Sequence, residues 1–192
     1  MPKTDIQKLQ KELNKELDTK RYEHTLGVAY TAACMAMRYD CDIQKAYIAG
    51  LLHDCAKCMT HEERLTYCKK HDIPVTEIEK QNPSLLHAKV GAGLCATKYG
   101  IEDSEIVNAI KYHTTGRPGM TLLEKIIFIA DYLEPHRNEA DDLPLVRKQV
   151  FEDMDLALRT ILSDTLIYLQ KGDKKIDPMT FQTYQYYTGE EK

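Results

Sequence analysis

Apolar residues recur along most of the chain at the three- and four-residue spacing of amphipathic helices. Glycine and proline are few, with 9 and 7 residues, and they separate apolar segments instead of filling them. This pattern predicts an all-α protein. The expected helices span residues 4–17, 20–38, 43–56, 60–71, 83–98, 103–113, 121–133 and 143–171, followed by a shorter one near 179–187.

Capping boxes mark several of the expected helix starts. In this motif a threonine hydroxyl and a Glu or Gln side chain three residues later satisfy backbone N–H groups that the first turn leaves free. The pairs that fit are Thr4 with Gln7, Thr60 with Glu63 and Thr121 with Glu124. The strand-like run at residues 126–130 follows the last of these caps inside a longer apolar stretch, so its length favours a buried helix.

Length and charge narrow the class of protein. A chain of 192 residues is expected to form one domain, with a core at about 20–171, an N-terminal helix at 4–17 and a C-terminal aromatic segment at 177–188. Its 26 basic and 30 acidic side chains leave a net charge of −4, which argues against nucleic acid or an anionic membrane as the partner. No apolar run reaches 18 residues and the charged start of the chain resembles no secretory signal, so we expect a cytoplasmic protein.

The six cysteines are too few for a disulfide scaffold in a chain of this length, so free and mostly buried thiols are expected. Cys55 and Cys58 form a CxxC pair, which is also typical of zinc half-sites and redox motifs. The sequence contains neither the second CxxC of a zinc ribbon nor the βαβ pattern of a thioredoxin. We therefore favour structural thiols over a redox or zinc role.

His53 and Asp54 are the sharpest candidates for chemistry. They follow the apolar run 46–52, and burying such groups unpaired costs about 2–7 kcal/mol. Gly50 lies one turn before Asp54, and its missing side chain is expected to leave room for a ligand or ion. A His-Asp pair by itself is also typical of a hydrogen-bonded structural pair, so the other polar residues of the apolar helices decide between the two interpretations.

Four further residues of this kind extend the set. They are His24, which begins an apolar stripe at helical spacing, and His87, His113 and Asp131, each within or directly after an apolar stretch. Imidazole nitrogens together with carboxylate oxygens suit Fe, Mn, Co, Ni or Zn. The alternative is a group of core residues that are satisfied separately. His61 and His71 lie among charged residues and are expected at the surface, whereas His136 is expected near the mouth of the site.

The order His24, His53-Asp54, Asp131 resembles the H…HD…D pattern of the HD-domain superfamily of metal-dependent phosphohydrolases. Longer segments resemble one bacterial branch, the YqeK family of symmetrical bis(5′-nucleosyl)-tetraphosphatases. They are GLLHDCAK at 50–57, LHA at 86–88, HTTGRPGMT at 113–121, EK at 124–125 and IADYLEPHR at 129–137. The resemblance runs from about residue 21 to 185 and implies an HD-domain helical bundle with the metal site in the bundle core.

The resemblance also implies which residues bind metal and nucleotide. The implied ligands of an iron-type metal, for which Mn, Co, Ni or Zn are substitutes, are His24, His53, Asp54 and Asp131. One metal is favoured; His87 and His113 occupy positions that hold a second metal in some HD proteins or line the nucleotide's phosphates. The residues implied in nucleotide binding are Arg21, His24, Asp54, Lys57, His87, His113, Asp131, Arg137 and Tyr184.

The implied substrate is diadenosine tetraphosphate, whose phosphates need local positive charge in a protein of net charge −4. Arg21, Lys57 and Arg137 would supply it, the arginines through paired hydrogen bonds. In-line attack of metal-bound hydroxide on an inner phosphorus would release two ADP. Asp54 would bind the metal and orient the water, and His87 or His113 would stabilise charge on the phosphates or protonate the leaving oxygen. The implied catalytic residues are Asp54, His87 and His113.

Two rival functions stay open. One is an HD phosphohydrolase that acts on another nucleotide, such as a cyclic dinucleotide or a nucleoside triphosphate. The other is a non-catalytic module that binds ADP or GDP and regulates a partner, although the complete set of ligand positions argues against it. The sequence also leaves a homodimer open.

The C-terminal segment has a signal of its own, because four aromatic residues fall within seven positions. They are Phe181, Tyr184, Tyr186 and Tyr187. The cluster either stacks on an adenine, with Tyr184 as the implied contact, or docks a terminal helix on the core. The pattern supports both interpretations equally.

Overall fold

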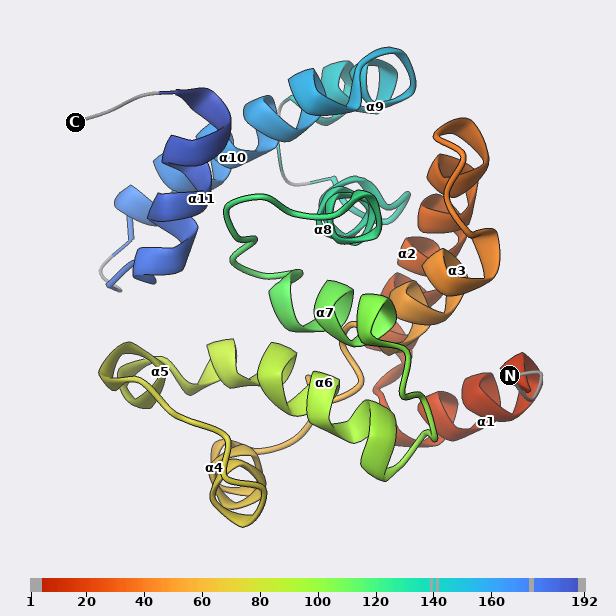
Figure 1. Cartoon of the computed structure of the whole chain (residues 1–192), viewed down its shortest axis with the longest axis vertical. Coiled ribbons are helices and arrows are strands. Elements are labelled where there is room, and N and C mark those ends of the chain that lie inside the picture. Colours follow the sequence, from red (N-terminus) through yellow and green to blue (C-terminus); the bar gives the residue numbers. More distant parts are fainter. Residues whose placement is uncertain (1–4, 139, 141, 173–174, 190–192) are drawn as a thin grey trace.

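Helices make up the computed structural model, which describes residues 5–138, 140, 142–172 and 175–189 (Figure 1). No strand occurs within those ranges, so the all-α prediction is confirmed. The elements are α1 (Ile6–Glu16), α2 (Thr19–Arg38), α3 (Ile43–Leu52), α4 (His61–Lys70), α5 (Glu77–Gln81), the 3₁₀ turn η1 (Pro83–Leu85), α6 (Leu86–Thr97), α7 (Ser104–Tyr112), α8 (Leu122–Leu133), α9 (Leu143–Glu152), α10 (Met154–Gln170) and α11 (Pro178–Thr188). None of these helices combines the length and the apolar character that crossing a bilayer requires.

Asp153 divides the stretch that the apolar pattern joined. The prediction of one helix at 143–171 is wrong, because α9 ends at Glu152 and α10 begins at Met154. Asp153 has an extended backbone, and its carboxylate accepts a hydrogen bond from the Leu156 N–H. An acidic N-cap therefore starts a new helix where the apolar spacing continues without a break.

One helix boundary and one short helix also differ from the prediction. The helix expected at 43–56 ends at Leu52, and residues 53–58 form turns beyond it. The short helix α5 was not predicted, because five residues are too few to show a helical period. Its capping box, Thr76 with Glu79, is nevertheless visible in the sequence.

The predicted capping boxes at Thr60 and Thr121 are both confirmed. Thr4, the third predicted cap, lies outside the described residues. The described N-cap of α1 is Asp5, whose carboxylate accepts a hydrogen bond from the Lys8 N–H.

Helix α8 runs through the middle of the bundle (Figure 1). It packs against α2, α3, α7, α9 and α10, and Ile126, Ile127 and Ile129 on it are fully buried. In Figure 1, α10 and α11 lie on one side of α8, and α4 to α6 lie on the other side. One apolar cluster extends from Leu9 on α1 to Leu162 on α10. The core therefore fixes α8, which carries Asp131, against α2, α3 and α7, the helices that carry or precede His24, His53, Asp54 and His113.

Gly50 brings α2 and α3 close together. A Cβ atom added at Gly50 would lie 2.7 Å from the Cα of Ala29 on α2, inside the backbone of the neighbouring helix. The expectation that Gly50 leaves room for a ligand or ion is wrong, since α2 occupies that space. The close approach instead sets the distance between His24 on α2 and His53 at the end of α3.

Candidate metal centre

Six candidate residues from five helices converge on one point in the bundle. Their exposed fractions are 7% or less, apart from Asp131, which is partly exposed. They are His24 on α2, His53 and Asp54 just after α3, His87 in the first turn of α6, His113 just after α7 and Asp131 on α8. The structure thus gathers residues that are up to 107 positions apart in the sequence.

One part of the cluster is formed by two histidines and a carboxylate. The Nε2 atoms of His24 and His53 are 3.3 Å apart, and His24 Nε2 is 3.1 Å from Asp131 Oδ1. Asp54 approaches the same pair through Oδ2, which is 3.5 Å from His53 Nε2. These are the residues for which the sequence implies the first metal.

The second part lies on the other side of Asp54. The Nε2 atoms of His87 and His113 are 3.1 Å apart. The Oδ1 atom of Asp54 is 3.1 Å from His87 Nε2 and 3.6 Å from His113 Nε2. The Asp54 carboxylate therefore lies between the two histidine pairs and presents one oxygen to each.

Local backbone geometry orients the histidine rings. A helix leaves the carbonyls of its last turn without backbone partners. His53 and His113 directly follow α3 and α7, and each Nδ1 lies 2.7 Å from a carbonyl of the helix's last turn, that of Gly50 or Ile110. His87 Nδ1 contacts the Ser84 carbonyl, again three residues earlier. These carbonyls accept hydrogen bonds from Nδ1–H, so the unprotonated Nε2 of each ring faces the cluster.

The chemistry of this donor set fits a divalent cation. In each histidine pair, the two Nε2 atoms face each other at 3.1–3.3 Å. Two nitrogen lone pairs at this distance repel each other unless a cation or a proton lies between them. The buried Oδ1 of Asp54 also has no well-directed hydrogen bond among the described residues. Two groups have ligand atoms within 4.8 Å of one another: His24, His53 and Asp131, and His53, Asp54 and His113.

Electrostatics favour charged carboxylates at Asp54 and Asp131 and a neutral imidazole at His87. Burial disfavours ionisation of Asp54 and Asp131, but the neighbouring histidines outweigh it and hold the pKa of both carboxyls well below the usual range. Burial also lowers the pKa of His87 to about 4, against the pull of Asp54. At neutral pH the carboxylates are charged and the His87 imidazole is neutral, which is the form that coordinates metal.

Three cationic side chains surround the cluster where the sequence placed positive charge. Arg21 Nη1 is 2.7 Å from Asp54 Oδ2, and Arg137 Nη2 is 3.0 Å from Asp131 Oδ1. Lys57 Nζ lies 3.2 Å from His87 Nε2. The three side chains are between 28% and 41% exposed, so each joins the buried cluster to its rim.

Glu134 is a site residue that the sequence analysis missed. Its side chain is 1% exposed, Oε1 lies 3.1 Å from His24 Nδ1, and Oε2 accepts a hydrogen bond from the His136 N–H. In the sequence, Glu134 lies within the IADYLEPHR segment that resembles the YqeK branch, but no role is predicted for it. The spacing of three from Asp131 was the available signal, because it puts both carboxylates on one face of α8.

The remaining histidines and the aromatic segment lie at the periphery. His61 and His71 are exposed. The His136 side chain is 60% exposed, with Nδ1 3.0 Å from Glu134 Oε2, so it lies next to the centre at the surface. Tyr184 on α11 is half-buried and packs against the main apolar cluster. Its neighbour Tyr187 accepts a hydrogen bond from the Met120 N–H, which fastens α11 to the 113–121 loop.

The two cysteines of the CxxC pair have different surroundings. Cys55 is buried, with Sγ 3.9 Å from the Gly91 carbonyl, whereas Cys58 is exposed and its Sγ lies 3.5 Å from Asp18 Oδ2. All six cysteines are free thiols. Burial raises the pKa of the Cys55 thiol well above its ordinary value, which makes it unreactive.

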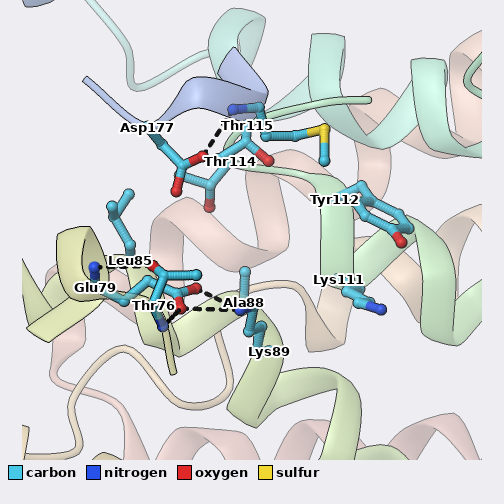
Figure 2. Close-up of a pocket in the computed structure, with 11 residues that line it drawn as sticks. Thr76, Glu79, Leu85, Ala88, Lys89, Lys111, Tyr112, Thr114, Thr115 and Asp177 are labelled. Carbon is cyan, nitrogen blue, oxygen red and sulfur yellow. Dashed lines mark hydrogen bonds and ion pairs between the residues drawn. The ribbon is translucent and has the colours of Figure 1, made fainter. Parts of the chain in front are cut away.

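A small pocket lies next to the His87 and His113 end of the centre, because Thr114, one of its lining residues, has Oγ1 3.2 Å from His113 Nε2. Its volume is about 150 Å³. Figure 2 shows Thr114, Thr115 and Asp177 on one side of it, opposite Leu85, Ala88 and Glu79. The complete lining is Thr76, Glu79, Leu85, Ala88, Lys89, Lys111, Tyr112, Thr114, Thr115, Asp177 and Met179.

Comparison with known protein families matches residues 21–136 to the HD domain, a span that includes all six residues of the cluster. The chain belongs to the HD-domain family. Among its relatives, the protein of Bacillus subtilis named symmetrical bis(5′-nucleosyl)-tetraphosphatase is 41% identical, over 91% of this chain and 92% of that protein. The protein of the same name from Halalkalibacterium halodurans is 41% identical, over 90% of this chain and 91% of that protein. The resemblance to the YqeK branch is thereby confirmed.

A solved structure shares the whole fold. It is described as a predicted HD superfamily hydrolase involved in NAD metabolism, from Clostridium acetobutylicum. The two sequences are 38% identical. The match covers 96% of this chain and 97% of the solved chain, and the two structures superpose with a TM-score of 0.92. The prediction of an HD-domain helical bundle is therefore confirmed as well.

Proposed function

We propose that the protein is a metal-dependent hydrolase that cleaves diadenosine tetraphosphate symmetrically into two ADP. The observation that carries the proposal is the position of Asp54 between two histidine pairs whose unprotonated nitrogens face inward. Relatives that bear the name of this activity are 35–41% identical over 90–95% of the chain. Six free thiols fit the reducing cytoplasm as its compartment.

Metal binding in the proposed enzyme is divided between two groups of residues. His24, His53, Asp54 and Asp131 hold the first cation, with iron as the proposed metal and Mn, Co, Ni or Zn as substitutes. His87 and His113 hold a second cation or meet the substrate's phosphates, and the metal content per chain decides between these roles. A bound cation lowers the pKa of a coordinated water and neutralises phosphate charge.

The chain's own residues position the reactants. Asp54 orients the attacking water, and Arg21, Lys57 and Arg137 bind phosphate oxygens at the rim. The water oxygen forms a bond to one inner phosphorus, and the bond from that phosphorus to the central bridging oxygen breaks. The bridging oxygen leaves with the second ADP, and water supplies the hydrogen atoms that balance the reaction. The candidate groups for stabilising the departing charge are His87 and His113.

Protein purified without oxygen and loaded with one metal at a time tests this function. We expect diadenosine tetraphosphate to have the highest kcat/KM in a panel that also contains a cyclic dinucleotide and ATP. A preference for one of the other nucleotides would establish the rival phosphohydrolase. Tight ADP binding with no phosphate release under any metal would establish the non-catalytic module.

A further inference from the structure

Two arginines on helices that carry no site residue bind the main chain beside the metal centre. Arg64 lies in the first turn of α4 and Arg147 in the middle of α9, and these helices lie on opposite sides of α8 (Figure 1). Every described hydrogen bond of the two guanidinium groups ends on a main-chain carbonyl. The two side chains therefore act on the position of the backbone.

Arg64 joins the turn after α3 to the segment that precedes His87. Its Nη2 lies 3.1 Å from the carbonyl oxygen of Lys57 and 2.6 Å from that of Met59, and its Nη1 lies 2.9 Å from the Pro83 carbonyl. The Lys57 Nζ atom in turn lies 3.2 Å from His87 Nε2. The guanidinium group thus fixes the backbone on both sides of the contact between Lys57 and His87.

Arg147 makes equivalent contacts at the opposite end of the centre. Its Nε lies 2.9 Å from the Leu133 carbonyl, and its Nη2 lies 2.9 Å from the Glu134 carbonyl and 2.8 Å from the Arg137 carbonyl. The last carbonyls of a helix have no partner within that helix, so those at the end of α8 are free to accept these bonds. Arg147 therefore fixes the turn from which the Arg137 side chain returns to Asp131.

The position of Arg64 is costly for the stability of the fold. Its side chain is buried, and none of its described hydrogen bonds goes to a carboxylate. A cation in the first turn of a helix also lies at the positive end of the helix dipole. The Nε atom has no hydrogen-bond partner among the described residues. An uncompensated buried charge of this kind favours a role for the guanidinium group itself, whose several donors reach two segments at once.

We propose that Arg64 and Arg147 are positioning residues that set where Lys57 and Arg137 meet the substrate's phosphates, an inference that rests on the proposed function. In each case one Nη2 atom lies within 3.1 Å of the carbonyl oxygen of the rim cation itself. The Lys57 and Arg137 side chains are long and partly exposed, so packing alone leaves them several rotamers. Anchoring their backbone limits the positions of the cationic groups and reduces the entropic cost of binding phosphate.

Binding of inorganic pyrophosphate to the metal-loaded protein tests the proposal without requiring turnover. Arg64→Lys and Arg147→Lys keep the positive charge but lose the paired donors. We expect each substitution to weaken pyrophosphate binding about tenfold while the circular dichroism spectrum is unchanged. Arg38→Lys is the matched control, because Arg38 Nε donates to the Phe151 carbonyl, which belongs to no site residue. This control should leave the affinity for pyrophosphate unchanged.

Double-mutant cycles separate positioning from a general loss of stability. In a Lys57→Ala background, Arg64→Lys should change the pyrophosphate affinity by less than about twofold, because the side chain that Arg64 positions is gone. In an Arg137→Ala background, Arg64→Lys should keep its full effect. Arg147→Lys should show the opposite pattern. A general loss of stability would weaken binding to the same extent in both backgrounds.

Additive losses in both backgrounds, or unchanged affinity in the two single lysine variants, would overturn the inference. If Arg64→Lys does not fold, the cycle with Arg147→Lys, at a partly exposed position, decides in its place. Failure of the proposed function is seen separately. If the cycles give the expected pattern but the wild-type protein does not cleave diadenosine tetraphosphate, the positioning role stands and the enzyme assignment falls.

Discussion

Glu134 Oε1 lies 3.1 Å from His24 Nδ1, although 110 residues separate the two in the sequence. The carboxylate fixes the ring so that Nε2 faces Asp131 and His53. Gly27, one turn after His24, makes room for it, because a Cβ there would lie 2.4 Å from Glu134 Oε2. Glu134 is therefore a positioning residue for the proposed first metal.

Replacing Glu134 by alanine should lower the affinity for the metal by about 10- to 100-fold, because His24 loses the group that sets its tautomer and orientation. Glu134→Gln keeps an acceptor for His24 and should lose less. Metal affinity, measured by competition with a chelator, and far-ultraviolet circular dichroism separate this effect from unfolding. Glu105→Ala, at an exposed ion pair with Lys45, is the control. Unchanged metal affinity in Glu134→Ala would refute the positioning role.

Asp54→Ala should abolish hydrolysis and remove most bound metal while the helical fold is retained. The expectation follows from geometry, since each Asp54 oxygen faces a different histidine pair. Elemental analysis, activity and circular dichroism of the purified variant check it. A variant that kept its bound metal and its rate of hydrolysis would show that Asp54 is needed neither for metal binding nor for catalysis.

In the metal-free protein, His87 should lower the stability of the fold as the pH falls from 6.5 to about 4. Burial lowers the pKa of His87 to about 4, so in this range the unfolded chain binds a proton that the folded protein excludes. The effect is on the order of 3 kcal/mol. Asp54 contributes in a lower pH range. Because its carboxyl pKa is lowered in the folded protein, Asp54 stabilises the fold above its ordinary value of 3.8, and this stability is lost as the pH falls below that value.

The pKa of His53 is raised, since Asp54 outweighs burial, and its effect has the opposite sign: it stabilises the fold below pH 6.5, and this is lost as the pH rises through the folded pKa. Urea unfolding of chelator-treated protein between pH 4 and 8 measures the sum. The His87→Gln variant should lose less stability than the wild type as the pH falls from 6.5 to 4. If its curve parallels that of the wild type, His87 is not the group responsible.

Gly50→Ala should destabilise the protein by about 1–3 kcal/mol, because the added methyl group enters the backbone of α2 at Ala29. Metal content should fall with it, since α2 and α3 carry His24 and His53. Thermal unfolding and elemental analysis measure both effects. Gly172→Ala, whose added Cβ meets only ordinary contact at 3.6 Å from the Leu169 carbonyl, should change neither.

The parts of the fold that depend on long apolar periods were predictable from the sequence. The most apolar helix, around Ile126 to Ile129, is the buried centre of the bundle as expected. Local polar signals were harder to weigh. Asp153 divides two helices because a carboxylate caps a backbone N–H, yet aspartate is equally common on exposed helix faces, so the apolar pattern favoured one helix.

The candidate site was predictable where a polar residue interrupts an apolar run, as at His53 and Asp131. Tertiary contacts decide the rest. Glu134 lies beside a helix break, and only the folded chain shows that its partner is His24. Gly50 is a second example. The space that its missing side chain leaves is filled by the backbone of α2, and the sequence does not show where α2 lies relative to α3.

Hydrolysis of diadenosine tetraphosphate in water enriched in oxygen-18 shows which bond the protein cleaves. We expect two ADP for each substrate consumed, with the heavy oxygen in only one of them, and no hydrolysis once the metal is removed. AMP and ATP as the products would contradict symmetrical cleavage at this centre.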